Sequence, residues 1–159
     1  MNEDMSFTNV KKINFQKRPL PIPADYRPLY KIAQILLVLK YCCRGGTSSL
    51  IRLHFFSWAM KSEDNKEKVL NIVYNKETKN FPIWRFEPAL NRALSFAIAE
   101  GLVEQAKLNY RLTPKGEEFV VRIIMLTDLM TSEKSFINKV KKKVTETLIK
   151  DISRRWETK

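Results

Sequence analysis

A mainly helical fold with one small β-hairpin is the class that this sequence predicts, and three observations support it. The chain has 159 residues, of which 44% are hydrophobic and only four are glycine, which is typical of a folded protein rather than a disordered one. Apolar residues recur at helical spacing over several long stretches. Between Pro88 and Leu112 the helical pattern gives way to two short extended segments. A chain of this length can bury one sizeable core.

The clearest pattern begins at Pro88–Glu100, which is predicted to be an amphipathic helix with proline in its first turn. Gly101 follows and can adopt the left-handed conformation that ends a helix. Leu102–Ala106 and Tyr110–Leu112 are the predicted strands of a hairpin. Thr113 then precedes a proline, as at the start of the next helix. Helix, two-stranded wing and helix is the pattern that closes a winged helix-turn-helix domain.

Three further helices are predicted before this stretch. The first, Pro28–Cys43, has little polar surface and should be central to the core. Either Thr47 or Ser48 is expected to cap the second, and Ser62 to cap the third. The extended segment Phe81–Phe86 is a candidate third strand of the wing sheet, where its proline restricts it to an edge.

The chain divides into three predicted parts. Residues 1–24 are expected to form an extended N-terminal arm, because alternating prolines in RPLPIP exclude a helix. Residues 25–130 form the winged-helix domain, whose last helix should reach about Met130. Residues 131–159 are predicted to be one basic amphipathic helix with an apolar stripe from Phe136 to Trp156. The arm and this stripe could each pack on their own domain or on a partner.

The net charge of +12 is unevenly distributed. Residues 61–130, which include the hairpin, carry 11 basic and 10 acidic side chains and are nearly neutral, whereas residues 131–159 carry nine basic and four acidic ones. An excess of this size favours an anionic partner such as nucleic acid, although it could serve solubility alone.

Compartment and chemistry are constrained by what the sequence contains. Cys42 and Cys43 are adjacent in an apolar helix, where a disulfide would be strained, so we expect buried reduced thiols. The acidic N-terminus lacks the apolar segment of a secretory signal, and the longest apolar run is too short to cross a bilayer. We therefore expect a cytoplasmic protein.

The sequence predicts no enzymatic activity. There is no phosphate-binding glycine loop, no cysteine pair at zinc spacing, and no nucleophile with a histidine to activate it, so no catalytic residue, metal ligand or cofactor is assigned. The single histidine, His54, lies among aromatic residues and is expected to have a packing or surface role. The function is therefore expected to be binding.

The helix before the wing is poorly equipped to read DNA. It offers Asn91, Arg92 and Ser95 amid alanine, leucine, phenylalanine and isoleucine, whereas base readout needs several basic or amide side chains. Contacts to DNA phosphates are instead assigned to basic residues: Lys139, Lys141, Lys142, Lys143, Arg154, Arg155, Lys107 and Arg111. Contacts to a partner protein are assigned mainly to apolar residues: Phe15, Leu20, Ile22, Arg92, Phe96 and Trp156.

Two segments resemble a known family. RPLYKIAQILLVLKYCCRGG, followed by FEPALNRALSFAIAEGLVE before YRLTPKGEEFV, is similar to the middle component of bacterial ABC-three-component systems, and most similar to the small accessory subunit of Lamassu-type anti-phage defence. The resemblance covers roughly residues 26–124. It implies a non-catalytic subunit that sits on a large SMC-like ABC ATPase and links it to an effector, commonly a nuclease.

Two classes of function therefore remain. The first is an adaptor subunit of an ATPase–effector complex in defence against phages or plasmids, with contact to DNA through its basic ends. The alternative is a stand-alone winged-helix transcription regulator, which should dimerise and bind a palindrome. A basic amphipathic helix that binds a membrane is the weakest option, because packing explains its modest apolar face more simply.

Overall fold

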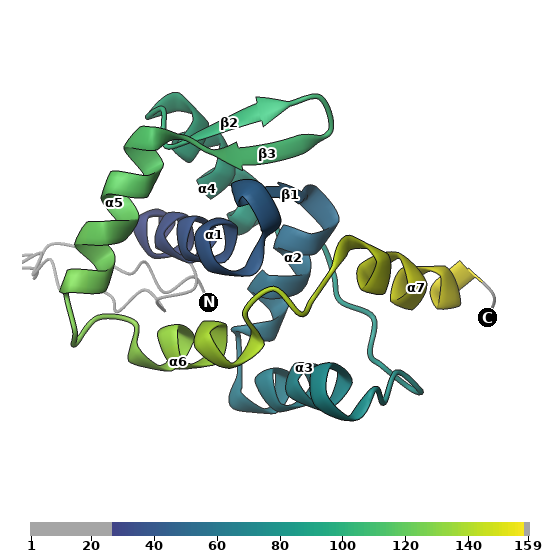
Figure 1. Cartoon of the computed structure of the whole chain (residues 1–159). Coiled ribbons are helices and arrows are strands. Elements are labelled where there is room, and N and C mark those ends of the chain that lie inside the picture. The colour runs from purple at the N-terminus through teal and green to yellow at the C-terminus, as the bar shows by residue number, and fades with distance from the viewer. Residues whose placement is uncertain (1–26, 158–159) are drawn as a thin grey trace, which may run out of the picture.

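The structure is a computed structural model that describes residues 27–157, and it confirms a mainly helical fold with a small antiparallel sheet (Figure 1). The helices are α1 (Pro28–Cys42), α2 (Leu50–Ala59), α3 (Glu63–Asn75), α4 (Pro88–Ala99), α5 (Pro114–Met125), α6 (Thr131–Val140) and α7 (Glu146–Glu157). The strands are β1 (Thr47–Ser49), β2 (Val103–Ala106) and β3 (Asn109–Leu112). None of the helices within this range is long and apolar enough to span a membrane.

α1 is the central helix, as its apolar sequence predicts. Every residue from Lys31 to Leu39 is buried, because α2, α4, α5 and α6 all pack against this helix (Figure 1). A helix that is covered on all sides has no solvent face to hold polar residues, which explains the missing polar stripe. It ends at Cys42, before a tight turn at Arg44–Gly46.

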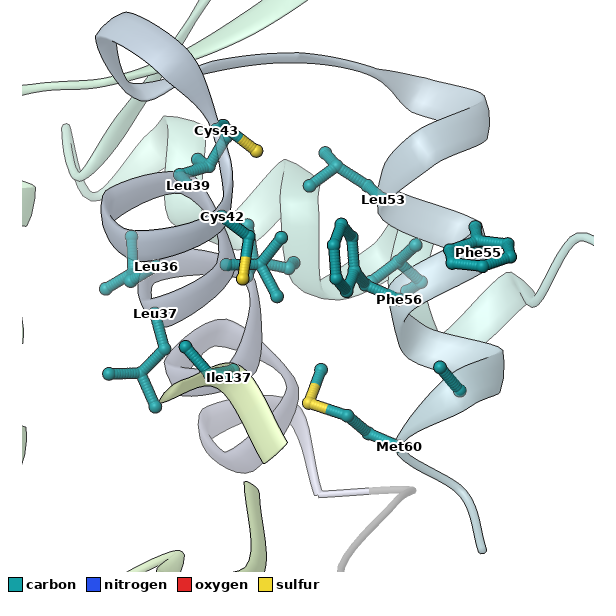
Figure 2. Packing of buried hydrophobic residues seen from close by; sticks show 14 of the residues in the cluster. Leu36, Leu37, Leu39, Cys42, Cys43, Leu53, Phe55, Phe56, Met60 and Ile137 are labelled. Atoms are coloured by element: carbon teal, nitrogen blue, oxygen red, sulfur yellow. The ribbon is translucent and has the colours of Figure 1, made fainter. Parts of the chain in front are cut away.

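The core between α1 and α2 contains both cysteines (Figure 2). Leu53 and Phe56 of α2 face Leu39 and Cys42 of α1, and all four side chains are at most 2% exposed. Both thiols are free, as predicted, and burial raises the pKa of each above its ordinary value. A thiol held protonated in an apolar core is unreactive and contributes to packing.

The sheet has three strands in the order β1-β3-β2, and its third strand is not the one predicted. The segment Phe81–Phe86 forms no strand; its place is taken by β1, where Thr47 pairs with Arg111. β1 also displaces the predicted cap of α2, since the N-cap is Ser49, whose hydroxyl accepts from the Arg52 N–H at 3.3 Å. Serine and threonine occur both as helix N-caps and in strands, so the sequence of Thr47–Ser49 fits either role. The pairing with β3 is what makes these three residues a strand.

The junction between α4 and the hairpin has the predicted geometry. Gly101 has a φ of +72°, and its N–H donates to Ile98 O at 3.0 Å while Leu102 N–H donates to Ala97 O at 2.9 Å. These two bonds form a Schellman motif, which satisfies the free carbonyls at the end of a helix. At the far end of the hairpin, the Thr113 hydroxyl caps α5 by accepting from Gly116 N–H at 3.1 Å.

Gly101→Ala is expected to lower the free energy of unfolding by about 1 kcal/mol, because a Cβ disfavours positive φ. The new Cβ would be 3.9 Å from its nearest neighbour, Lys115 Cδ, so no steric overlap adds to this strain. Urea titration followed by circular dichroism measures the change. An alanine variant as stable as the parent would contradict the left-handed conformation at this residue.

The C-terminal part differs from the single helix predicted for residues 131–159. α5 ends at Met125 rather than near Met130, and a turn over residues 141–145 separates α6 from α7. Lys141 stops α6 with φ 47° and ψ −132°, outside the helical region. The Thr145 hydroxyl then accepts from Leu148 N–H at 3.1 Å and starts α7. The apolar spacing continues through this turn, which is why periodicity alone did not locate the break.

The turn lets both halves of the apolar stripe pack on the same protein. α6 packs on α1 and α3, and α7 packs on α2. Ile149 and Ile152 are at most 1% exposed, and the rings of Trp156 and Trp84 lie edge to face with centroids 4.3 Å apart. The stripe is therefore buried mainly within the chain, and Trp156, a predicted interface residue, is partly buried against the same core.

Candidate functional site

A buried polar network lies beneath the N-terminus of α4. Lys31 of α1 is fully buried, and its ammonium donates to Ser57 Oγ at 2.9 Å and to Glu87 Oε2 at 3.3 Å. Ser57 in turn donates to the same carboxylate oxygen at 2.7 Å, and Lys61 Nζ lies 3.1 Å from Oε1. Buried charges must be paired and hydrogen-bonded to be tolerated. Glu87 therefore joins α1, α2 and the start of α4.

His54 extends this network to the outer side of α4. Its Nδ1 accepts from Glu87 N–H at 3.0 Å, so in the neutral ring the proton is on Nε2, which donates to Asn91 Oδ1 at 2.9 Å. The histidine is fully buried. It is thus a packing residue with both ring nitrogens bonded, in agreement with the packing role considered for it from the sequence.

The network sets the pKa of two groups in it. Burial raises the pKa of Glu87, but the Ser57 hydroxyl and the Lys31 and Lys61 ammonium groups outweigh it and hold the pKa below its ordinary value. Burial lowers the pKa of His54. Glu87 is thus held as the anion and His54 as the neutral ring, and both states are those that the hydrogen bonds require.

The exposed side of α4 has little capacity to read bases. Asn91 has its amide oxygen committed to His54, and the Ser95 hydroxyl donates to the carbonyl of Asn91 at 3.0 Å. Arg92 and Phe96 are exposed one helical turn apart, with Phe96 48% exposed. An exposed aromatic residue beside an arginine is a combination enriched at protein interfaces.

The hairpin offers limited positive charge. Arg111 Nε donates to Glu104 Oε1 at 2.6 Å across the two strands, so its charge is partly neutralised. Lys107 lies in the tight turn with a φ of 58°, next to Leu108, which is 86% exposed. The hairpin therefore presents one lysine and one leucine at its tip.

Two of the predicted phosphate-contacting residues in the C-terminal segment are also engaged within the chain. Lys143 Nζ lies 3.9 Å from the centroid of the Tyr74 ring, a cation–π contact. Arg155 Nη1 donates to Thr78 O at 2.9 Å. The others are exposed at their side chains: Lys139, Lys141, Lys142 and Arg154. Lys141, Lys142 and Lys143 lie together on the turn between α6 and α7.

A second ion pair, between a buried arginine and a partly exposed glutamate, holds this turn in place. Arg52 of α2 is 6% exposed, and its Nε lies 3.1 Å from Glu146 Oε1. The same carboxylate accepts from Ser49 N–H at 2.9 Å and from the Ser49 hydroxyl at 2.7 Å. The start of α7 is therefore fixed to the start of α2, and the lysines before it are presented from a rigid support.

Sequence reasoning missed the structural importance of Glu87, Arg52 and Glu146. Each reads as a surface charge in sequence, and only a hydrophobic context on both sides of Arg52 and Glu87 hinted at burial. The predicted interface residues Phe15, Leu20 and Ile22 lie outside the described residues.

Among residues 27–157, no group of three or more histidine, cysteine, aspartate or glutamate side chains could hold a metal ion. Comparison with protein-family models, with curated proteins and with solved structures finds no match. The exposed side of α4, the hairpin tip and the lysines of the turn between α6 and α7 are therefore interpreted from their own geometry.

Proposed function

We propose that this protein is a non-catalytic adaptor subunit of a cytoplasmic complex, built on a winged-helix domain. The order of α1, β1, α2, α4, β2 and β3 supports the winged-helix assignment, as does a sheet in which β3 lies between β1 and β2. In this interpretation α3 and the loop after it are an insertion before α4, the helix that reads DNA in DNA-binding members of the class.

The surface of α4 carries the proposal. Its asparagine is bonded to a buried histidine, and its most prominent exposed pair is Arg92 and Phe96. Reading several base pairs needs a set of free arginine, lysine, asparagine or glutamine side chains. An exposed aromatic residue gains more by burial against another protein. A protein contact therefore suits this helix better than the major groove.

The identity of the partners rests on the resemblance in sequence. The resemblance implies a large SMC-like ABC ATPase and an effector, commonly a nuclease, which act in defence against phages or plasmids. The charge of +12 favours contact with DNA as a second, sequence-independent role within the assembled complex, through cations such as Arg154 and Lys107.

Co-expression of the chain with an ATPase and an effector of the proposed classes, sought among the products of its neighbouring genes, tests the proposal. The wild-type chain is expected to co-purify with both, and mass measurement of the intact complex gives its composition. Phe96→Glu is expected to release the chain, because the carboxylate would be buried without a partner in an apolar contact. Leu108→Glu makes the same kind of change at the hairpin tip and is expected to leave the complex intact.

Other outcomes would contradict the proposal in different ways. A wild-type chain that purifies alone as a dimer and protects a palindromic DNA sequence would establish the transcription-regulator alternative. A complex that survives Phe96→Glu would place the contact on a surface other than α4.

A further inference from the structure

A groove lies on the side of α1 where α5 and α6 meet it. It has a volume of about 680 Å³. Leu37 and Ile137 lie at its base and are at most 3% exposed, whereas Tyr41 and Ile124 line it with 39% and 41% of their surface exposed. α1, α5, α6 and the turn after α6 supply the lining, and α4 supplies none of it. This groove is therefore separate from the proposed contact on α4.

The apolar lining continues along the outer side of α5. Val121, Ile124 and Met125 follow the i, i+3, i+4 spacing of one helix face and are 53%, 41% and 75% exposed. Leu126, which follows them, is 58% exposed. The neighbouring side of α5, with Val120 and Ile123, is already buried in the core. α5 is thus apolar on two sides, and only one of them is covered within residues 27–157.

The other rim of the groove is positively charged. Its lining includes four lysines, Lys134 and Lys141–Lys143, and no acidic residue. Lys134 donates to the carbonyls of Ile123 and Leu126 at 2.8 and 2.7 Å, and Lys143 lies over Tyr74. The side chains of the other two, Lys141 and Lys142, make no hydrogen bond or ion pair to another residue in the range 27–157. They are available to an anion.

We propose that this groove binds an amphipathic helix of a partner protein, with apolar residues on one face and acidic residues along one edge. The inference rests on the proposed adaptor function and adds a second docking surface to it, which a subunit that links two proteins requires. The apolar face would cover α5 and the groove, and the acidic edge would pair with Lys141 and Lys142. Because α1, α5 and α6 form most of the lining, an incoming helix can pack there in the same way as α5 and α6 pack on α1.

Charge and polarity argue against the other occupants. A second copy of this chain, also with a charge of +12, would bring positive surfaces together. Duplex DNA would pair with the lysines but leave the apolar strip of Val121, Met125 and Leu126 without a partner. Only a ligand that is both apolar and acidic can cover the apolar strip on α5 and also pair with the lysines of the other rim.

The test places a photoreactive benzoylphenylalanine at position 41 of the full chain, co-expressed with its ATPase and effector. Irradiation is expected to cross-link a partner segment with leucine, isoleucine, valine or phenylalanine at helical spacing and aspartate or glutamate along one edge. The same group at position 96, on α4, is the matched control and should label a different segment. Cross-links to DNA, to lipid, to a second copy or to residues 1–26 would overturn the inference.

A synthetic peptide of the cross-linked segment then measures affinity by fluorescence anisotropy. Lys141→Glu with Lys142→Glu, and separately Ile124→Asp, are expected to weaken binding about tenfold or more, and salt to weaken binding to the wild type. Lys150→Glu with Arg154→Glu makes the same charge change on α7 and should have little effect. Circular dichroism confirms that each variant folds.

The results separate the groove from the adaptor role. If the wild-type chain assembles with its partners and the groove variants bind and assemble equally well, the groove inference is wrong and the proposed function stands. If the wild-type chain does not assemble at all, the proposed function fails and the inference fails with it.

Discussion

Gly116→Ala is expected to destabilise the fold by about 3 kcal/mol, the upper range for inserting atoms into a well-packed site. A Cβ on Gly116 would lie 2.2 Å from Leu102 O and 2.7 Å from Leu112 Cδ1. The first contact is with backbone at the start of the hairpin, which cannot move aside as a flexible side chain could. Alanine normally favours a helix over glycine by about 1 kcal/mol, but the overlap outweighs this gain.

Urea titration of the purified chain measures this effect, and Gly101→Ala is the matched comparison. Gly101 has positive φ but open surroundings, whereas Gly116 lies within α5 and is crowded. We expect the Gly116 variant to lose clearly more stability than the Gly101 variant. Equal losses would show that α5 does not approach the hairpin as closely as the structure places it.

Glu87→Gln is expected to lower the free energy of unfolding by about 3 kcal/mol, as is typical when one partner of a buried ion pair is removed. The amide keeps the shape of the side chain but not its charge beside the ammonium groups of Lys31 and Lys61. Lys31 is fully buried, so water cannot replace the lost interaction.

Glu117→Gln provides the control for this prediction. Glu117 pairs with Lys40 at 3.2 Å, but both side chains are about half exposed, at 54% and 41%. A surface ion pair contributes only about 0–1 kcal/mol, so the same substitution should have little effect there. Similar losses for the two variants would contradict a buried, charge-paired Glu87.

The same network makes stability depend on pH. The pKa of His54 is lower in the folded chain than its ordinary 6.5, and that of Glu87 is lower than its ordinary 4.5. In both cases the unfolded chain takes up the proton first, so their stabilisation is complete above those values and is lost as the pH falls through the folded-state pKa. The thermal unfolding temperature should therefore fall between pH 7 and pH 3. Below pH 4.5 it should fall less in the Glu87→Gln variant than in the wild-type chain, because the variant lacks the Glu87 carboxylate.

Local signals in the sequence determined much of the fold. The apolar composition of α1 determined its central position, because a helix without a polar face must be covered on all sides. Ser62, Thr113 and Gly101 marked helix ends correctly, since caps act through neighbouring backbone groups that local sequence supplies. The two adjacent cysteines were correctly predicted to be buried free thiols, because a disulfide between neighbouring residues is strained and the surrounding helix is apolar.

Tertiary structure alone decided the features that depend on distant residues. Thr47–Ser49 became a strand because β3 lies beside it, 60 or so positions further along the chain. Lys141 ends a helix whose apolar spacing runs on, because the turn lets α7 reach α2. Glu87 became a buried anchor because Lys31 meets it in the core, and Glu146, which is partly exposed, became one because Arg52 lies beside it. The apolar outer side of α5 joined the lysines of the turn for the same reason: packing, unlike capping, is determined by which elements meet in space.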